Sequence, residues 1–285
     1  MLYKKVLSNI FLVFTAVIFC AFPVCAKELK FAVVSDINYA NQSATDTDSD
    51  ASKIPTILNA FVERVNENNY DFVVFLGDNI AKSNEKNLEG FLNIVKTVNT
   101  PYYLVMGNQD VHKISGLDKK EYLKIVSEHN KYQKKKDASY YFYPNKDVIV
   151  IVLDGVSSGM PTNHGVFSQN TLKWLDELLT KNEKKKAVIF QHVPYIAPYE
   201  NPSYDILEKT DYRAVLSRHN NIIGVFAGHY KKESAVKDDN GVMHICVPAL
   251  SQHPYSYLDM SLRYKKFPLR KAKDFVFDGS LKPAI

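Results

Sequence analysis

Six short apolar runs constrain the fold of this chain more than any other sequence feature. They lie at 29–34, 72–76, 102–106, 148–153, 187–190 and 222–226. Runs that are apolar throughout, rather than at alternate positions, are typical of parallel strands covered on both faces. The stretches between them carry helical periodicity, as from Ile54 to Val65 after Ser52, and from Leu172 to Leu179, where Ser168 is the expected N-cap. Strands that alternate with helices predict a single α/β domain over 27–285.

The character of the sequence changes after residue 230. The segment Asp238-Asp239-Asn240-Gly241 separates two strand-like runs, which is typical of a β-hairpin turn. We therefore expect the C-terminal part of the chain to form a second sheet that is more antiparallel than the first.

The first 26 residues have the composition of an export signal. Lys4 and Lys5 precede a nearly uninterrupted apolar stretch from Val6 to Val24, and Val24-Cys25-Ala26 approximates a small-residue cleavage site. Cleavage before Lys27 would place the protein in a periplasmic, secreted or cell-envelope location. The nineteen residues of this stretch also reach the roughly 17–25 that a spanning helix needs, so an uncleaved membrane anchor is the alternative.

Charge and cysteine content restrict the partners and the chemistry of the chain. The formal net charge of +5 is too small to predict nucleic-acid binding. Cys246 is the only cysteine after residue 26, so the mature chain forms no internal disulfide. Its apolar neighbours are typical of an ordinary strand residue, and we assign Cys246 no chemistry.

Polar side chains follow five of the predicted strands at the point where each strand ends. These clusters are Ser35-Asp36-Ile37-Asn38, Gly77-Asp78-Asn79, Gly107-Asn108-Gln109-Asp110, Gln191-His192-Val193-Pro194 and Gly228-His229-Tyr230-Lys231. Because the carboxyl ends of the strands of an open α/β sheet meet at one crevice, we expect two carboxylates, a carboxamide and two imidazoles in one cleft.

This mixture of oxygen and imidazole donors suits a divalent transition metal such as Mn, Fe or Zn, whereas Ca²⁺ and Mg²⁺ favour oxygen alone. Such an ion activates water and clamps phosphoryl oxygens, so the donor set predicts hydrolysis of a small-molecule phosphoester. Taken alone, each cluster is also compatible with a helix cap or a surface histidine. Five clusters in succession at strand ends favour a functional site.

The order of the five clusters resembles that of the calcineurin-like metallophosphoesterases, from about residue 29 to residue 250. The resemblance implies an α/β fold in four layers, an α/β/β/α sandwich of two mixed sheets flanked by helices. It also implies two metal ions, with Asp78 bridging them. Asn108, His192 and His229 would complete the second metal site, and Asp36 would serve the first. Asp110 ends the third cluster and is predicted to act in catalysis with Asp78 and Asn108.

Three positions depart from the family pattern, because Asn38, Gln109 and Lys231 stand where the family carries histidine. Asn38 and Lys231 both belong to the first metal site, so we expect one or two bound ions. Lys231 is predicted either to pair with Asp36 in place of an ion or to point into solvent. Gln109 can bind a phosphoryl oxygen but cannot deliver a proton, a task for which His112 is a nearby substitute.

Two functions are compatible with this pattern. The first is an exported metal-dependent phosphoesterase that hydrolyses a phosphomonoester or a phosphodiester. The alternative is a catalytically impaired protein that binds phosphate or another ligand on the same scaffold. In both cases, loops within 111–138 and 195–210 are expected to shape the pocket for a small-molecule ligand.

Overall fold

The computed structural model describes residues 25–41, 50–134, 137–159, 162–266 and 273–285. Residues 1–24 of the predicted export signal lie outside this part of the chain, whereas Cys25 and Ala26 are the first two positions of strand β1 (Cys25–Val34). Among the described residues, no helix is both long and apolar enough to cross a membrane.

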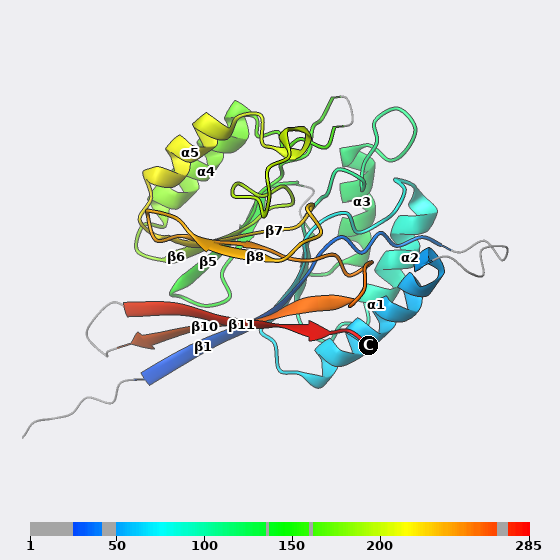
Figure 1. Cartoon of the computed structure of the whole chain (residues 1–285), viewed down its shortest axis with the longest axis horizontal. Coiled ribbons are helices and arrows are strands. Elements are labelled where there is room, and N and C mark those ends of the chain that lie inside the picture. The colour runs from blue at the N-terminus through cyan, green and yellow to red at the C-terminus, as the bar shows by residue number, and fades with distance from the viewer. Residues whose placement is uncertain (1–24, 42–49, 135–136, 160–161, 267–272) are drawn as a thin grey trace, which may run out of the picture.

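Two mixed sheets form the centre of the molecule (Figure 1). The first has the order β11-β10-β1-β2-β3, in which β1, β2 (Phe72–Phe75) and β3 (Tyr102–Leu104) are parallel. The second has the order β4-β5-β6-β7-β9-β8. Its parallel strands are β5 (Val148–Val152), β6 (Lys186–Phe190), β7 (Ile222–Ala227) and β9 (Met243–Cys246). All six predicted strands are therefore present, and their ends differ from the prediction by a few residues at most.

Helices cover the outer face of each sheet. On the first sheet lie α1 (Asp50–Glu67), α2 (Glu85–Val95) and α3 (Lys119–His129), and on the second lie α4 (Gln169–Lys181) and α5 (Lys209–Ser217) (Figure 1). Ser168 caps α4 by accepting a hydrogen bond from Thr171 N, as predicted. The first helix begins at Asp50, two residues before the expected Ser52.

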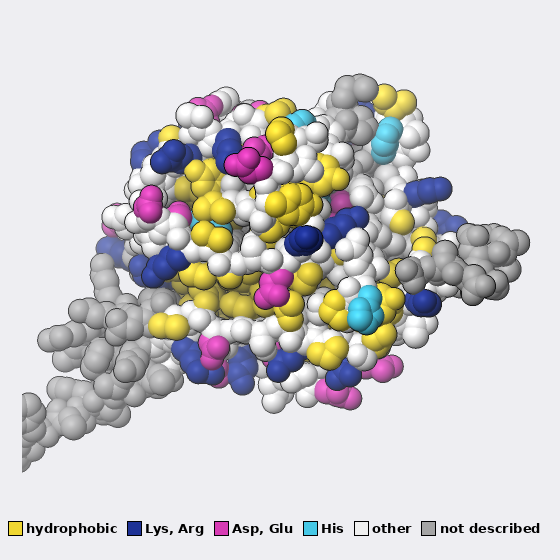
Figure 2. All heavy atoms as spheres, in the orientation of Figure 1, with side chains coloured by type: hydrophobic (Ala, Val, Ile, Leu, Met, Phe, Trp, Pro, Cys, Tyr) yellow, Lys and Arg dark blue, Asp and Glu magenta, His cyan; other side chains and the backbone are white. Residues whose placement is uncertain are grey.

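Three apolar cores separate the layers. One lies between α1–α3 and the first sheet, a second fills the space between the sheets with residues such as Phe31 and Phe190, and a third packs α4 and α5 onto the second sheet. Three cores between four layers confirm the predicted α/β/β/α sandwich. On the face drawn in Figure 2, basic and acidic side chains are interspersed around a band of apolar ones.

The expectation of a separate antiparallel sheet after residue 230 is wrong. The predicted hairpin forms between β8 (Ser234–Lys237) and β9, but β9 pairs in parallel with β7 and so extends the second sheet. The last two strands, β10 (Ser256–Lys266) and β11 (Lys273–Pro283), join the first sheet instead, where β10 runs antiparallel to β1. The short strand β4 (Tyr140–Phe142) lies at the other edge of the second sheet, antiparallel to β5.

Candidate metal centre

The carboxyl ends of the parallel strands of both sheets meet at one place. Asp36 and Asp78 follow β1 and β2, and His192 and His229 follow β6 and β7. All four side chains are buried, with exposed fractions of 0 to 6%. The structure therefore brings four of the predicted site residues together, two from each sheet.

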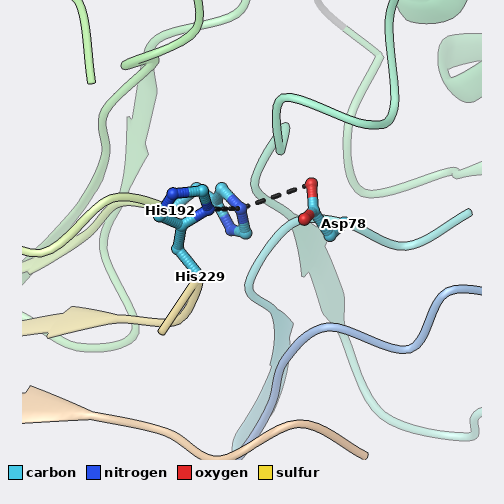
Figure 3. A group of neighbouring side chains, drawn as sticks. All are labelled: Asp78, His192 and His229. Carbon is cyan, nitrogen blue, oxygen red and sulfur yellow. Dashed lines mark hydrogen bonds and ion pairs between the residues drawn. The ribbon is translucent and has the colours of Figure 1, made fainter. Parts of the chain in front are cut away.

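Asp78, His192 and His229 form the centre of this cluster, and Figure 3 shows their side chains pointing toward one another. Nε2 of His192 lies 3.3 Å from Oδ1 of Asp78, and Nδ1 of His229 lies 3.2 Å from Nε2 of His192. One possible ligand atom from each residue lies within 4.8 Å of the other two. Carboxylate and imidazole donors at this spacing can share one divalent ion.

The ring of His192 is held in orientation by the backbone. Its Nδ1 donates a hydrogen bond to the carbonyl oxygen of Leu76 at 2.9 Å, which leaves Nε2 directed at Asp78. Ligating histidines in proteins are commonly fixed in this way through the nitrogen that does not bind the metal.

The local electrostatics favour positive charge at this place. Burial lowers the pKa of His192, but the charges of Asp78 and Asp36 and the hydrogen bond to Asp78 raise it to about 9. For His229, burial and the neighbouring charge of His192 lower the pKa to about 3. The two carboxylates thus stabilise a positive charge on His192, whereas burial and that charge favour the neutral form of His229.

Asp36 offers only one of its carboxylate oxygens. Its Oδ2 accepts hydrogen bonds from Ser35 Oγ at 2.6 Å and from the backbone N of His229 at 2.9 Å. A Cβ atom at Gly228 would lie 2.7 Å from this same oxygen and would overlap Ser35 Oγ, so the close approach of β7 to β1 requires glycine here. Oδ1 of Asp36 is buried and has no hydrogen-bond partner among the described residues.

Several buried polar atoms of the site have no hydrogen-bond partner among the described residues. They are Oδ1 of Asp36, Oδ1 of Asn38, Oδ1 of Asn108 and Nε2 of His229. Because buried polar atoms are almost always paired, unpaired oxygen and nitrogen donors beside Asp78 and His192 fit a metal ion. The residues that the structure brings together therefore suit the divalent transition metal predicted from the sequence.

Strained backbone is concentrated at the same residues. Five of the six non-glycine residues with positive φ in the described part of the chain are predicted site residues, with φ between 49 and 67°. They are Asp36, Asn38, Asp78, His229 and Lys231. Non-glycine residues rarely adopt this left-handed conformation, and residues that do so are concentrated at functional sites.

The third cluster contributes to the site in three different ways. Asn108 is half-buried, and its Nδ2 donates to Asn163 Oδ1 at 3.2 Å, which leaves its own Oδ1 available. Gln109 contributes its backbone N, which donates to Asp78 Oδ1 at 2.9 Å. Gly107 allows this loop to lie against Asp78, because a Cβ atom there would come within 2.9 Å of Asp78 Cα.

The carboxylate of Asp110 is fully buried and hydrogen-bonded to the loops after β2 and β3, and its part in catalysis stays a prediction. Its Oδ1 accepts from the backbone N of Ile80 at 3.0 Å, and its Oδ2 accepts from the backbone N of Gly107 at 2.8 Å and from Asn79 Nδ2 at 3.0 Å. Burial and the nearby charge of Asp78 raise the pKa of Asp110 to about 7. Asp110 is a positioning residue that ties the loop after β2 to the loop after β3.

Of the two positions predicted for Lys231, the structure does not contain the ion pair with Asp36. The side chain of Lys231 is half-buried and makes no ion pair with any residue that the structure describes. Its positive charge nevertheless contributes to the low pKa of His229. Lys231 thus lies close enough to the site to influence it electrostatically.

Sequence reasoning missed several neighbours of the site. Asn38 donates through Nδ2 to Ser251 Oγ at 3.1 Å, and Ser251 in turn donates to the Asp36 carbonyl at 2.7 Å. Tyr204 packs its ring 4.6 Å from the His229 ring between centroids, so the segment 195–210 does reach the site. Ser35 is adjacent to Asp36, whereas the roles of Ser251 and Asn163 depend on contacts between distant loops and leave no local sequence signal.

A serine-hydrolase interpretation is excluded by local geometry, although Gly155, Ser157 and Gly159 have the Gly-x-Ser-x-Gly spacing of a nucleophile elbow. Such an elbow joins a strand directly to a helix. Here β5 ends at Val152 and α4 begins only at Gln169. Ser157 Oγ accepts a hydrogen bond from Gly159 N at 3.2 Å within this long loop.

Comparison with known proteins relates the chain to metal-dependent phosphoesterases. The human manganese-dependent ADP-ribose/CDP-alcohol diphosphatase is 34% identical over 87 residues, which are 29% of this chain and 25% of the human protein. A probable cyclic nucleotide phosphodiesterase of Fibrobacter succinogenes is 21% identical over 221 residues, 77% of this chain and 79% of that protein. The chain thus spans only a quarter of the human relative but most of the bacterial one.

Solved structures share the fold at low sequence identity. A dimetal phosphatase from Danio rerio superimposes with a TM-score of 0.65 and 16% identity, covering 87% of this chain and 98% of that one. GAP50, the anchor in the inner membrane complex of Plasmodium, gives a TM-score of 0.56 and 14% identity, covering 88% and 89%. The family model for calcineurin-like phosphoesterases matches residues 29–232, the segment that carries all five polar clusters through His229. The chain therefore belongs to the calcineurin-like phosphoesterase family.

Proposed function

We propose that this protein is an exported phosphoesterase that hydrolyses a phosphomonoester or phosphodiester of a small molecule at the strand-end metal centre. The observation that carries the proposal is the buried cluster of Asp78, His192 and His229. It is accompanied by the buried Oδ1 atoms of Asp36 and Asn108, which have no hydrogen-bond partner among the described residues. A structural role alone would not leave this number of buried donors unpaired.

The chain's own residues would bind the metal and position the phosphoryl group. Asp78, His192 and His229 would hold the ion, with Asp36 Oδ1 and Asn108 Oδ1 as further ligands. A divalent ion supplies Lewis acidity, which polarises phosphoryl oxygens and makes water more nucleophilic. In the hydrolysis, a water oxygen bonds to phosphorus, the ester P–O bond breaks, and the leaving oxygen takes up a proton. Gln109 can orient a phosphoryl oxygen, but its carboxamide cannot provide that proton.

We further propose that the site holds one ion rather than two. Asn38 and Lys231 keep the left-handed backbone of their metal-binding neighbours, but Asn38 directs its Nδ2 to Ser251 and Lys231 brings a positive charge. A protonated amine cannot ligate a cation and repels one nearby. Outside the cluster of Asp78, His192 and His229, too few ligand atoms remain for a second ion. The positive charge of Lys231 would also repel that ion.

Hydrolysis of chromogenic esters tests the proposed activity. The protein would be assayed with bis(p-nitrophenyl) phosphate and p-nitrophenyl phosphate with and without Mn²⁺, beside Asp78→Asn. Asp239→Asn, which changes an exposed carboxylate in the β8–β9 turn, is the matched control. We expect Mn²⁺-dependent turnover in the wild type and in the control, and none in Asp78→Asn. Absence of turnover with Mn²⁺, Fe²⁺ and Zn²⁺ would refute the phosphoesterase.

A binding protein on the same scaffold is the second candidate, and the carboxamide of Gln109 in place of a proton donor favours it. GAP50, which shares the fold, is described as an anchor. This function predicts that metal and inorganic phosphate bind to the wild type although neither ester is hydrolysed. Phosphate affinity measured by calorimetry, in parallel with the ester assay, separates the two candidates.

The proposed export is tested independently of the chemistry. Lys4, Lys5 and the apolar stretch from Val6 to Val24 support it. Mass spectrometry of the protein expressed with its complete N-terminus should find a mature chain that begins at Lys27. An intact N-terminus in the membrane fraction would indicate an uncleaved anchor, and an intact N-terminus in the cytoplasm would contradict export.

A further inference from the structure

Asn108 can act as a metal ligand only when the oxygen end of its amide group faces the ion. The two ends of an amide have nearly the same shape, but the oxygen accepts hydrogen bonds and cations, whereas the nitrogen only donates. Asn108 is half-buried, and its Oδ1 is buried without a hydrogen-bond partner among the described residues. A neighbour that engages Nδ2 therefore decides which end of this amide is available to a metal.

Asn163 is that neighbour. Its Oδ1 accepts a hydrogen bond from Nδ2 of Asn108 at 3.2 Å, although 55 positions separate the two residues. Asn108 follows β3 of the first sheet, whereas Asn163 lies in the loop that leaves β5 of the second sheet and leads to α4. The orientation of the Asn108 amide is therefore set by a residue from the opposite sheet.

The backbone that follows Asn163 is fixed against the segment after β6. The backbone N of Gly165 donates to Asp205 O at 3.2 Å, and the backbone N of Leu207 donates to Gly165 O at 2.9 Å. Nδ1 of His164 also donates to Asp205 O, at 3.2 Å. Because these hydrogen bonds hold the loop in place, Asn163 meets Asn108 with its acceptor already positioned, and little ordering is needed when a metal binds.

The same loop also borders His229. Burial and the positive charge of His192 lower the pKa of His229 to about 3, and the backbone of Asn163 opposes part of this shift. The segment after β6 reaches the same imidazole, because the ring centroids of Tyr204 and His229 lie 4.6 Å apart. Asn163 thus acts on two predicted ligands, on Asn108 through its side chain and on His229 through its backbone.

We propose that Asn163 is a positioning residue that directs Oδ1 of Asn108 at the metal ion and thereby sets the metal affinity of the centre. This inference rests on the proposed function, because it requires that a metal binds beside Asn108. Residues that hold metal ligands in orientation commonly contribute about 10–100-fold to metal affinity. Asn163 would have this role for Asn108, as the carbonyl oxygen of Leu76 has for the His192 ring.

The exposure of Asn163 separates this role from a contribution to folding. The residue is exposed, and its Nδ2 donates to no residue that the structure describes. Truncation of an exposed side chain usually changes the free energy of unfolding by less than about 0.5 kcal/mol. The acceptor oxygen is therefore the part of Asn163 that matters, and aspartate, which has the same shape and two acceptor oxygens, should replace it.

The test measures Mn²⁺ affinity by calorimetry in the wild type, Asn163→Ala and Asn163→Asp. Asn170→Ala, which truncates an exposed asparagine in the first turn of α4, is the matched control. We expect the Kd for Mn²⁺ to rise about tenfold in Asn163→Ala. In Asn163→Asp it should stay within roughly threefold of the wild type or fall, because a charged acceptor forms the stronger hydrogen bond. The control should bind as the wild type does, and urea denaturation without metal should find all four proteins equally stable.

Three results would overturn the inference while leaving the proposed phosphoesterase intact. Equal Mn²⁺ affinity in Asn163→Ala and the wild type would show that water orients Asn108 equally well. An equal loss of affinity in Asn163→Ala and Asn163→Asp would show that the acceptor oxygen is not what matters. A loss of affinity that accompanies lower stability of the metal-free protein would indicate a structural role. Wild-type protein that binds no Mn²⁺ would instead refute both this inference and the proposed metal centre.

Discussion

Nε2 of His192 lies 3.3 Å from Oδ1 of Asp78, although the two residues follow strands of different sheets. Asp78 follows β2 of the first sheet, and His192 follows β6 of the second. The hydrogen bond from His192 Nδ1 to the O atom of Leu76, which directly follows β2, reinforces this connection. The metal centre therefore depends on how the two sheets pack, and the apolar core between them sets the geometry of the site.

Gly228→Ala should damage the metal centre. The new methyl group would overlap Ser35 Oγ and lie 2.7 Å from Asp36 Oδ2, and these atoms belong to a tightly bonded, buried group that cannot move aside easily. We expect unfolding free energy to fall by about 1–3 kcal/mol and Mn²⁺ affinity to fall at least tenfold. Chemical denaturation and calorimetry measure the two effects. Gly159→Ala, where a Cβ atom meets only Ser157 Oγ at 3.7 Å, should leave both unchanged.

Asp110→Asn should destabilise the protein more than it affects the chemistry. The carboxylate accepts three hydrogen bonds, from Ile80 N, Gly107 N and Asn79 Nδ2, and an amide group would direct its own N–H at one of these donors. We expect a loss of about 1–3 kcal/mol in unfolding free energy, measured by urea denaturation beside the exposed Asp239→Asn. A variant that is as stable as the wild type but inactive would indicate direct catalysis by Asp110 instead.

Asn38→His/Lys231→His should create a second metal site. The substitutions place imidazoles on backbone that already has positive φ, beside the free Oδ1 of Asp36, and they remove the ammonium charge. We expect bound Mn²⁺ to rise from one to two ions per chain in elemental analysis. Asn38→His alone retains the Lys231 charge and should stay at one ion. A double variant that still binds one ion would show that these positions do not limit metal occupancy.

Gln109→His should accelerate hydrolysis only of esters with poor leaving groups. General acid catalysis contributes about 10²–10⁴-fold when a proton must reach the leaving oxygen. We expect at least a tenfold gain for an alkyl phosphodiester and little change for a p-nitrophenyl ester, from parallel kcat measurements. Unchanged rates with the alkyl ester would mean that another group, such as His112, already supplies the proton.

Much of the fold is readable from the sequence because its signals are local. The continuous apolar runs predict the six central strands, Ser168 predicts the start of α4, and Asp238 to Gly241 predict the β8–β9 turn. The placement of β10 could not be predicted in this way, because its pairing with β1 joins residues more than 200 positions apart. Local patterns do not specify which open sheet edge a late strand will join.

At the site, too, features that depend on local sequence could be predicted, whereas those that depend on contacts between distant residues could not. Asp36, Asp78, His192 and His229 follow strands, so the general rule for strand ends brings them together. The positioning role of Asp110 depends on donors from two loops, and the contact of Asn38 with Ser251 crosses 213 positions. Sequence identifies which residues belong to the site, whereas contacts between distant loops decide what each residue does there.

Metal binding to the purified protein tests the proposed metal centre. Calorimetry with Mn²⁺, confirmed by elemental analysis after desalting, would be performed on the wild type, Asp78→Asn and the control Asp239→Asn. We expect one ion per chain in the wild type and the control, and none in Asp78→Asn. Wild-type protein that binds no transition metal, or an Asp78→Asn variant that binds as tightly as the wild type, would contradict a metal centre at the junction of the two sheets.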